Sequence, residues 1–211
     1  MALYVNSTVN GLKIGIPGTT PSSKNTAVGE FALYDITSGY RNTAVGHQAL
    51  SNTTTTIDNT AVGTQVLRDN IGSANTGIGS YSLLANTSGH SNTCLGYSSG
   101  NQISDGVRNI CLGYRAGLSI TSGSGNTIIG ANILGTAALT DTVIIGVGNG
   151  VERLRIHGDG ALSINTTNLT NYGQTSNSFN INNAGGTAGN WSCRRDTGAV
   201  IQATDADSGW A

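Results

Sequence analysis

A five-residue pattern recurs along this chain at a nearly fixed spacing. The sequence NTAVG begins at Asn25, Asn42 and Asn59, and related pentapeptides continue to Gly146. Aligned on their last residue, the eight copies lie 16 or 17 residues apart and end at Gly29, Gly46, Gly63, Gly79, Gly96, Gly113, Gly130 and Gly146. A repeat of this period predicts a solenoid, in which each copy forms one coil that stacks on the next.

The two residues before each glycine form columns of different size. The residue directly before the glycine is always branched and aliphatic, and the one before that is small in the first copies and larger in the last. Neighbouring residues of a strand face opposite ways, so the columns lie on opposite faces. We expect the larger column to line the inside of the coils as the structural core: Val28, Val45, Val62, Ile78, Leu95, Leu112, Ile129 and Ile145. The smaller, uncharged column then needs another packing partner: Ala27, Ala44, Ala61, Gly77, Cys94, Cys111, Ile128 and Ile144.

The rest of each repeat predicts a second strand, a turn and a column of stacked asparagines. After the glycine, aliphatic pairs such as Ala32–Leu33 and Ala49–Leu50 predict a second short strand, followed by a turn rich in Gly, Asn, Asp and Ser. The glycine suits a positive φ or a close approach between chains. Stacked amides can bond to each other or to the turn backbone, which predicts a ladder of Asn25, Asn42, Asn59, Asn75, Asn92, Asn109 and Asn126.

A single coil of this kind buries little apolar area, since it carries only one or two large aliphatic residues. Repeats stabilise by stacking, and the second apolar column still needs a partner. Three chains around a common axis would supply it. We therefore expect an all-β, homotrimeric parallel β-roll or β-helix of about eight coils over residues 25–150, followed by a small β-rich tip.

Composition restricts the possible partners. The formal net charge is −1 and charged residues make up 10% of the chain, which argues against nucleic acid as a partner. No apolar run approaches the roughly 18 residues of a membrane span, and no secretory signal is visible at the N-terminus. The three cysteines and three histidines do not show metal-ligand spacing, so we expect neither metal nor cofactor. Cys94 and Cys111 share a column in adjacent coils, close enough for a disulfide, but buried thiols are favoured.

Three stretches of the chain resemble known families. NTAVGEFAL and NTAVGHQAL, which begin at Asn25 and Asn42, look like the repeats of bacteriophage tail-fibre proteins. They are also similar to the head repeats of trimeric autotransporter adhesins, which form trimeric parallel β-rolls. VERLRIHGDGALSIN, residues 151–165, resembles the segment that often closes the repeat region of phage fibres. An autotransporter would add a signal peptide, a stalk and a membrane barrel, none of which is recognised here, so the phage family is favoured.

The flanks of the repeats suggest separate roles. Residues 1–24 form an N-terminal cap or a segment that attaches to a phage tail or baseplate protein, residues 151–165 a hairpin, and residues 166–211 a C-terminal tip. Aromatic rings beside charged groups suit a sugar-binding surface, and the candidate receptor contacts are Trp191, Arg194, Arg195, Asp196 and Trp210. The alternative is that Trp191 fills the core of the tip and Arg194 pairs with Asp196 or Asp207.

These observations lead to a functional hypothesis. The resemblance implies a phage tail fibre that recognises a bacterial surface glycan, assembles in the host cytoplasm, resides in the virion tail and does not enter a membrane. One alternative is a purely structural tail rod without receptor binding. A glycan depolymerase would need a carboxylate pair across a groove, and the closest acids, Asp205 and Asp207, lie near the end of the chain. We therefore expect no enzymatic activity.

Overall fold

The computed structural model describes residues 7–9, 12–15, 24–160 and 162–164, and these residues form strands and turns without a helix. They all belong to one of the chain's two compact units, residues 1–168; the other unit, residues 169–211, lies outside the described residues. The described strands are β1 (Ser7–Val9), β2 (Leu12–Gly15), β3 (Thr26–Val28), β4 (Thr43–Val45), β5 (Thr60–Val62), β6 (Thr76–Ile78), β7 (Thr93–Leu95), β8 (Ile110–Leu112), β9 (Thr127–Ile129), β10 (Val143–Val147), β11 (Val151–Ile156) and β12 (Leu162–Ile164).

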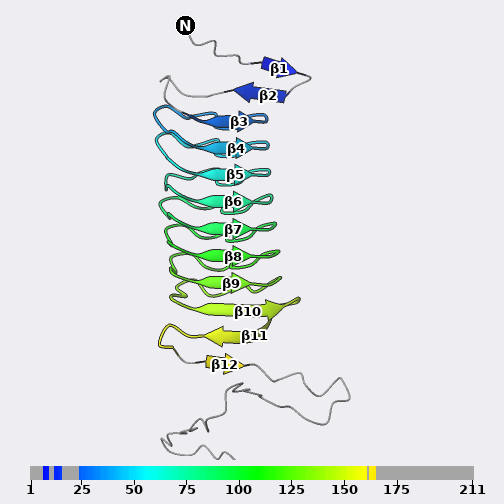
Figure 1. The fold of residues 1–211 in the computed structure, drawn as a ribbon, viewed down its shortest axis with the longest axis vertical. Helices are drawn as coiled ribbons and strands as arrows, with labels where there is room; N and C mark the ends of the chain where they lie inside the picture. Colours follow the sequence, from blue (N-terminus) through cyan, green and yellow to red (C-terminus); the bar gives the residue numbers. More distant parts are fainter. Residues whose placement is uncertain (1–6, 10–11, 16–23, 161, 165–211) are drawn as a thin grey trace, which may run out of the picture. The chain divides into compact units, whose positions relative to one another are not determined.

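Strands β3 to β10 are stacked in sequence order and pair in parallel (Figure 1). The register places equivalent repeat positions opposite each other, as in the pairs Ala27↔Ala44 and Val28↔Val45. One repeat is therefore one coil, and adjacent coils are about 4.8 Å apart. The predicted parallel β-solenoid is confirmed.

The glycine that ends each pentapeptide turns the chain out of the strand. At Gly29 the backbone φ is +129°, and a Cβ atom there would lie 2.7 Å from the carbonyl oxygen of Gly46 in the next coil. The positive φ proposed from the sequence is confirmed here, and the close approach is one between successive coils of the same chain.

The segment after the glycine is not the second strand that the sequence predicted. It is a series of turns in which alternate residues have positive φ, for example 57° at Phe31 and 49° at Leu33. Backbone bonds still join the coils, because Leu33 N–H donates to the Ala49 carbonyl at 3.0 Å. An extended strand would place Ala49 and Leu50 on opposite faces, whereas the turn conformation buries both.

The assignment of the core column was wrong. The small column lies inside the coils, where Ala44 and Cys94 are fully buried, whereas Ile78 is 37% and Leu95 48% exposed. The interior is narrow, and leucines from the opposite wall, such as Leu50, already fill it. The residues predicted as core instead face outward from the strands and are half-buried or exposed: Val28, Val45, Val62, Ile78, Leu95, Leu112, Ile129 and Ile145.

Side-chain sizes inside the coils compensate each other. Where the small column enlarges to Cys94, the opposite leucine is replaced by Gly100, and a Cβ on Gly100 would lie 2.5 Å from the cysteine Sγ. A further buried residue, Ile103, lies 3.0 Å from the same point. Close-packed interiors have a nearly fixed volume, so a larger residue on one wall requires a smaller one on the other.

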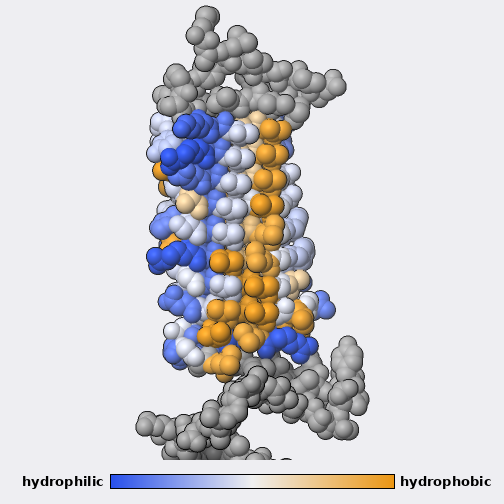
Figure 2. Space-filling model, in the orientation of Figure 1, coloured by the Kyte–Doolittle hydropathy of each residue, from blue (hydrophilic) through white to orange (hydrophobic). Residues whose placement is uncertain are grey.

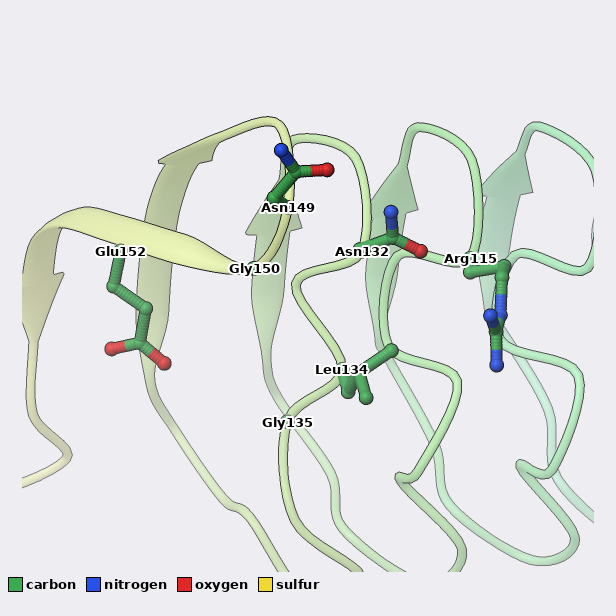
Figure 3. A pocket seen from close by; sticks show the side chains of 7 residues that line it. All are labelled: Arg115, Asn132, Leu134, Gly135, Asn149, Gly150 and Glu152. Atoms are coloured by element: carbon green, nitrogen blue, oxygen red, sulfur yellow. The ribbon is translucent and has the colours of Figure 1, made fainter.

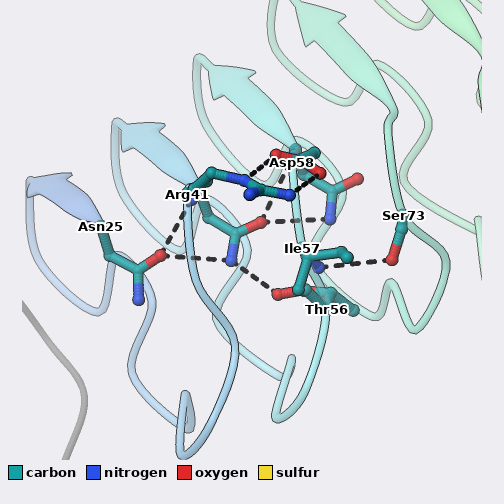
Figure 4. Close-up of polar contacts among 8 residues, drawn as sticks. Asn25, Arg41, Thr56, Ile57, Asp58 and Ser73 are labelled. Atoms are coloured by element: carbon teal, nitrogen blue, oxygen red, sulfur yellow. Dashed lines mark hydrogen bonds and ion pairs between the residues drawn. The ribbon is translucent and has the colours of Figure 1, made fainter. Parts of the chain in front are cut away.

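The predicted asparagine ladder is confirmed, and its amides bond both up the stack and to the turn backbone (Figure 4). The Asn25 Oδ1 atom accepts from the Asn42 backbone N–H at 2.8 Å, and the Asn42 Nδ2 atom donates to the Thr56 carbonyl at 2.7 Å. The same bonding pattern recurs up the stack, and all seven side chains are buried: Asn25, Asn42, Asn59, Asn75, Asn92, Asn109 and Asn126. The ladder occupies backbone groups at the turn that would otherwise be buried without partners.

Antiparallel strands cover both ends of the parallel stack. At the first coil, β2 pairs with β3 through Ile14↔Val28 and Gly15↔Ala27. At the last coil, β10 turns at Asn149 and Gly150 into β11, which pairs with β12. Each terminal strand of the parallel stack therefore has its backbone hydrogen bonds satisfied by a neighbour.

Candidate functional site

The receptor contacts predicted from the sequence cannot be located on the solenoid. Trp191, Arg194, Arg195, Asp196 and Trp210 all lie outside the described residues. The described part of the chain offers three other surface features: an apolar stripe, a tyrosine row and a polar groove.

The apolar stripe runs along the strands, and Figure 2 shows it as a continuous hydrophobic band. It consists of the outward column that precedes the glycines: Val28, Val45, Val62, Ile78, Leu95, Leu112, Ile129 and Ile145. Near the C-terminal coils it widens, because the threonine two residues earlier in each repeat is replaced by Ile110 in β8 and Val143 in β10. Contiguous apolar surface of this kind is typical of an interaction site.

The tyrosine row lies beside the stripe in the middle coils. Tyr97 and Tyr114 directly follow the repeat glycines, and their rings stack at 5.6 Å with an interplanar angle of 15°. Tyr81 meets Tyr97 edge-on at 5.6 Å. Both stacked rings are 48% exposed, so they extend the apolar surface while their hydroxyl groups can reach solvent or a partner.

The polar groove lies on the segments that follow the strands and on β11, near the C-terminal end of the solenoid (Figure 3). Its volume is about 620 Å³, and the residues that line it are Arg115, Asn132, Leu134, Gly135, Asn149, Gly150 and Glu152. Arg115 and Asn132 occupy the same position in successive coils and share a positive φ, 54° and 56°. The positive φ follows from the turn geometry of that segment, so the fold itself presents these side chains in a row.

Charge in the groove is unevenly compensated. Glu152 accepts two hydrogen bonds from Arg155, from Nη2 at 2.6 Å and Nε at 2.9 Å. Arg115 has no ion pair with a carboxylate in the described part of the chain. The guanidinium of Arg115 is therefore the uncompensated charge of the groove.

The remaining ion pairs lie on the outer turns and do not form a site. Arg41 forms a bidentate pair with Asp58 in the next coil, and this hydrogen bonding lowers the pKa of the Asp58 carboxyl (Figure 4). The Arg68 guanidinium lowers the pKa of Asp69 in the same way. Such exposed pairs contribute little to stability, typically about 0–1 kcal/mol.

Cys94 and Cys111 face each other across β7 and β8 as free, buried thiols, as expected from the sequence. Burial raises the pKa of the Cys94 thiol well above its usual range, and the neighbouring Cys111 raises it further. A protonated, fully buried thiol is a poor nucleophile and a poor metal ligand. The pair packs as small apolar groups of the interior.

Among the described residues, no three His, Cys, Asp or Glu side chains are grouped so that they could hold a metal ion. None of these residues belongs to a helix that is long and apolar enough to cross a membrane. No family model, no curated protein and no solved structure matches the chain.

Sequence reasoning missed the polar groove. The available signal was a change along one column, where Gln48 and Gln65 in the early coils give way to Arg115 and Asn132. The outward position of Leu134 could not be inferred, because an aligned leucine is buried in the early coils.

Proposed function

We propose that this chain is a bacteriophage tail-fibre protein whose solenoids assemble as a parallel homotrimer. In this assembly it recognises a bacterial surface glycan without cleaving it. The observation that carries the proposal is the apolar stripe, because it runs over all eight parallel strands without a charged residue. A surface of this extent is costly to expose to water.

The period of the stripe favours another copy of the same chain as its partner. Its side chains recur at the strand spacing of about 4.8 Å, so a continuous fit requires a partner with the same repeat. Three parallel copies around one axis would bring equivalent coils to the same level and bury all three stripes together. The repeats NTAVGEFAL and NTAVGHQAL support the same arrangement, because they resemble phage tail-fibre repeats and also the head repeats of trimeric autotransporter adhesins.

Glycan recognition rests on the resemblance and on the composition of residues 166–211, which include both tryptophans and the Arg194–Arg195 pair. Attachment to a tail or baseplate protein is assigned to residues 1–24. Binding is favoured over cleavage because the polar groove on the described surface has one carboxylate in its lining, whereas glycoside hydrolysis usually uses two.

Two measurements test the proposal. Light scattering on the purified protein should give three times the chain mass of 21.4 kDa; a monomer would contradict the assembly. The full chain should also adsorb to host bacteria, and a trimer ending at Asn165 should adsorb less. Loss of adsorption in both would favour a structural tail rod, and release of soluble oligosaccharide would establish a depolymerase.

A further inference from the structure

The polar groove contains an apolar side chain that the repeat does not normally expose. In the early coils the fourth residue after the glycine is a fully buried leucine: Leu33, Leu50, Leu67 and Leu83. Leu134 has the same position but is 38% exposed. In this coil the positive-φ position that those leucines hold is taken by Gly135, with φ of 71°, beside the buried Ile128. Leu134 therefore lies one residue before the interior position and lines the groove.

Polar groups surround this leucine on consecutive levels of the stack. Figure 3 shows the amides of Asn132 and Asn149 along one edge, with the Arg115 side chain at one end and Glu152 at the other. The levels are about 4.8 Å apart, so the groove is elongated along the stack and can follow a chain-like ligand. Amides and a carboxylate offer both donors and acceptors to hydroxyl groups.

The charged side chains of the groove, Glu152 and Arg115, favour an acidic ligand over a neutral one. Both carboxylate oxygens of Glu152 are held by Arg155, so this acid repels an incoming anion only weakly. Arg115 has no carboxylate partner among the described residues, and its planar set of donors matches the two oxygens of a carboxylate. A binding site with a few convergent polar groups and one apolar wall is the usual form of a small-ligand site.

We propose that the polar groove binds an acidic saccharide, in which a uronic acid carboxylate pairs with Arg115. The sugar hydroxyls bond to Asn132 and Asn149, and the apolar face of the ring packs on Leu134. This inference rests on the proposed function for the source of the ligand, a bacterial surface polysaccharide. The groove is lined by segments after the strands and by Glu152 of β11, whereas the apolar stripe lies on β3 to β10, so trimer assembly and saccharide binding use different residues. Three grooves per trimer would add avidity to a weak single site.

The binding test uses the full-length protein on immobilised oligosaccharides that differ only in one residue: glucuronic acid, glucose or glucose phosphate. The variant Arg115→Gln restores the residue type of Gln48 and Gln65, which occupy the same coil position, so folding should be preserved. We expect it to lose at least about tenfold in affinity for the glucuronic acid ligand, the loss of one good charge-assisted pair. Arg108→Gln, at an exposed arginine of the preceding turn outside the groove, is the matched control and should bind as the wild type does.

The outcomes separate this proposal from the proposed function. Equal binding of the glucuronic acid and glucose ligands, equal binding by Arg115→Gln and wild type, or no binding by the wild type overturns the groove assignment. Binding of the phosphate ligand alone overturns the choice of a carboxylate. If wild type and Arg115→Gln adsorb equally to host cells, the receptor site lies elsewhere and the tail-fibre proposal stands. If Arg115 is needed on the array but no bacterium is bound, the groove stands and the tail-fibre proposal fails.

Discussion

Removing one amide from the asparagine ladder should destabilise the solenoid strongly. Asn92 lies in the middle of the stack and its side chain takes part in four hydrogen bonds. Its Nδ2 atom donates to the Gly106 carbonyl at 2.8 Å and to the Asn75 Oδ1 atom at 3.2 Å. Its Oδ1 atom accepts from the backbone N–H of Asn109 at 3.0 Å and from the Asn109 amide at 3.1 Å.

The variant Asn92→Ala leaves two buried backbone groups without their partners, the Gly106 carbonyl and the Asn109 N–H. The neighbouring ladder amides keep other bonds, since Asn75 Oδ1 still accepts from the Asn92 N–H and Asn109 Nδ2 still donates to Gly123. An unsatisfied buried group costs about 1–3 kcal/mol, so the expected loss is about 2–6 kcal/mol per chain. Coils stabilise their neighbours, so the loss should affect the stack on both sides.

Urea denaturation measures this loss in free energy of unfolding. The protein concentration is kept fixed, because a change in assembly state would change the apparent stability. The control is Asn52→Ala, at an exposed turn asparagine that donates to Asp69 at 2.6 Å. Its effect should stay within about 1 kcal/mol. Equal stability changes in the two variants would refute the view that the ladder supports the turn backbone.

Three further predictions concern the interior and the apolar stripe. Leu95→Asp should give folded monomers, because the carboxylate interrupts the stripe and not the core; a trimer by light scattering would contradict this. Ala44→Leu should destabilise by about 1–3 kcal/mol through overpacking, as measured by urea denaturation, whereas Thr43→Leu on the same strand should cost less; equal losses would contradict the interior assignment. In a Cys193→Ser background, Cys94 and Cys111 should react with a thiol reagent only after denaturation, since both are buried; rapid labelling of the native protein would show that the coils open.

Much of the fold could be predicted from the period alone. A constant interval of 16 or 17 residues with the same strand residues in each copy requires a stack of equivalent coils. The asparagine and glycine roles followed from their chemistry, since an amide can bond along a stack and glycine tolerates a positive φ. Both features depend on local backbone geometry, which the repeated sequence determines directly.

The orientation of the strands could not be predicted from residue size. We expected the larger column inside, but the interior is shared with Leu33, Leu50, Leu67 and Leu83 from the opposite wall, so only small residues fit in the early coils. The spacing between the asparagine and the small residue of each repeat indicated which column lies inside the coils. Asn25 and Ala27 are two residues apart and therefore share a face, and an amide that serves the turn backbone must lie inside. The polar groove was missed for a related reason, since in its coil Gly135 takes the interior position of the early leucines and Leu134 is exposed.

The two apolar columns obey different constraints, and the difference bears on assembly. Inside the coils, the growth from Ala44 to Cys94 is offset on the opposite wall by the change from Leu50 to Gly100, because the coil volume is limited. The outward column also grows, from valine in the first three coils to isoleucine or leucine in the later five, with no wall opposite it in a single chain. A solvated face would tolerate polar residues at these positions, yet every one of them is a branched aliphatic residue. This uniformity is explained if the outward column has its own packing partner, and only a partner with the same period can meet every coil. A copy of the same chain has that period.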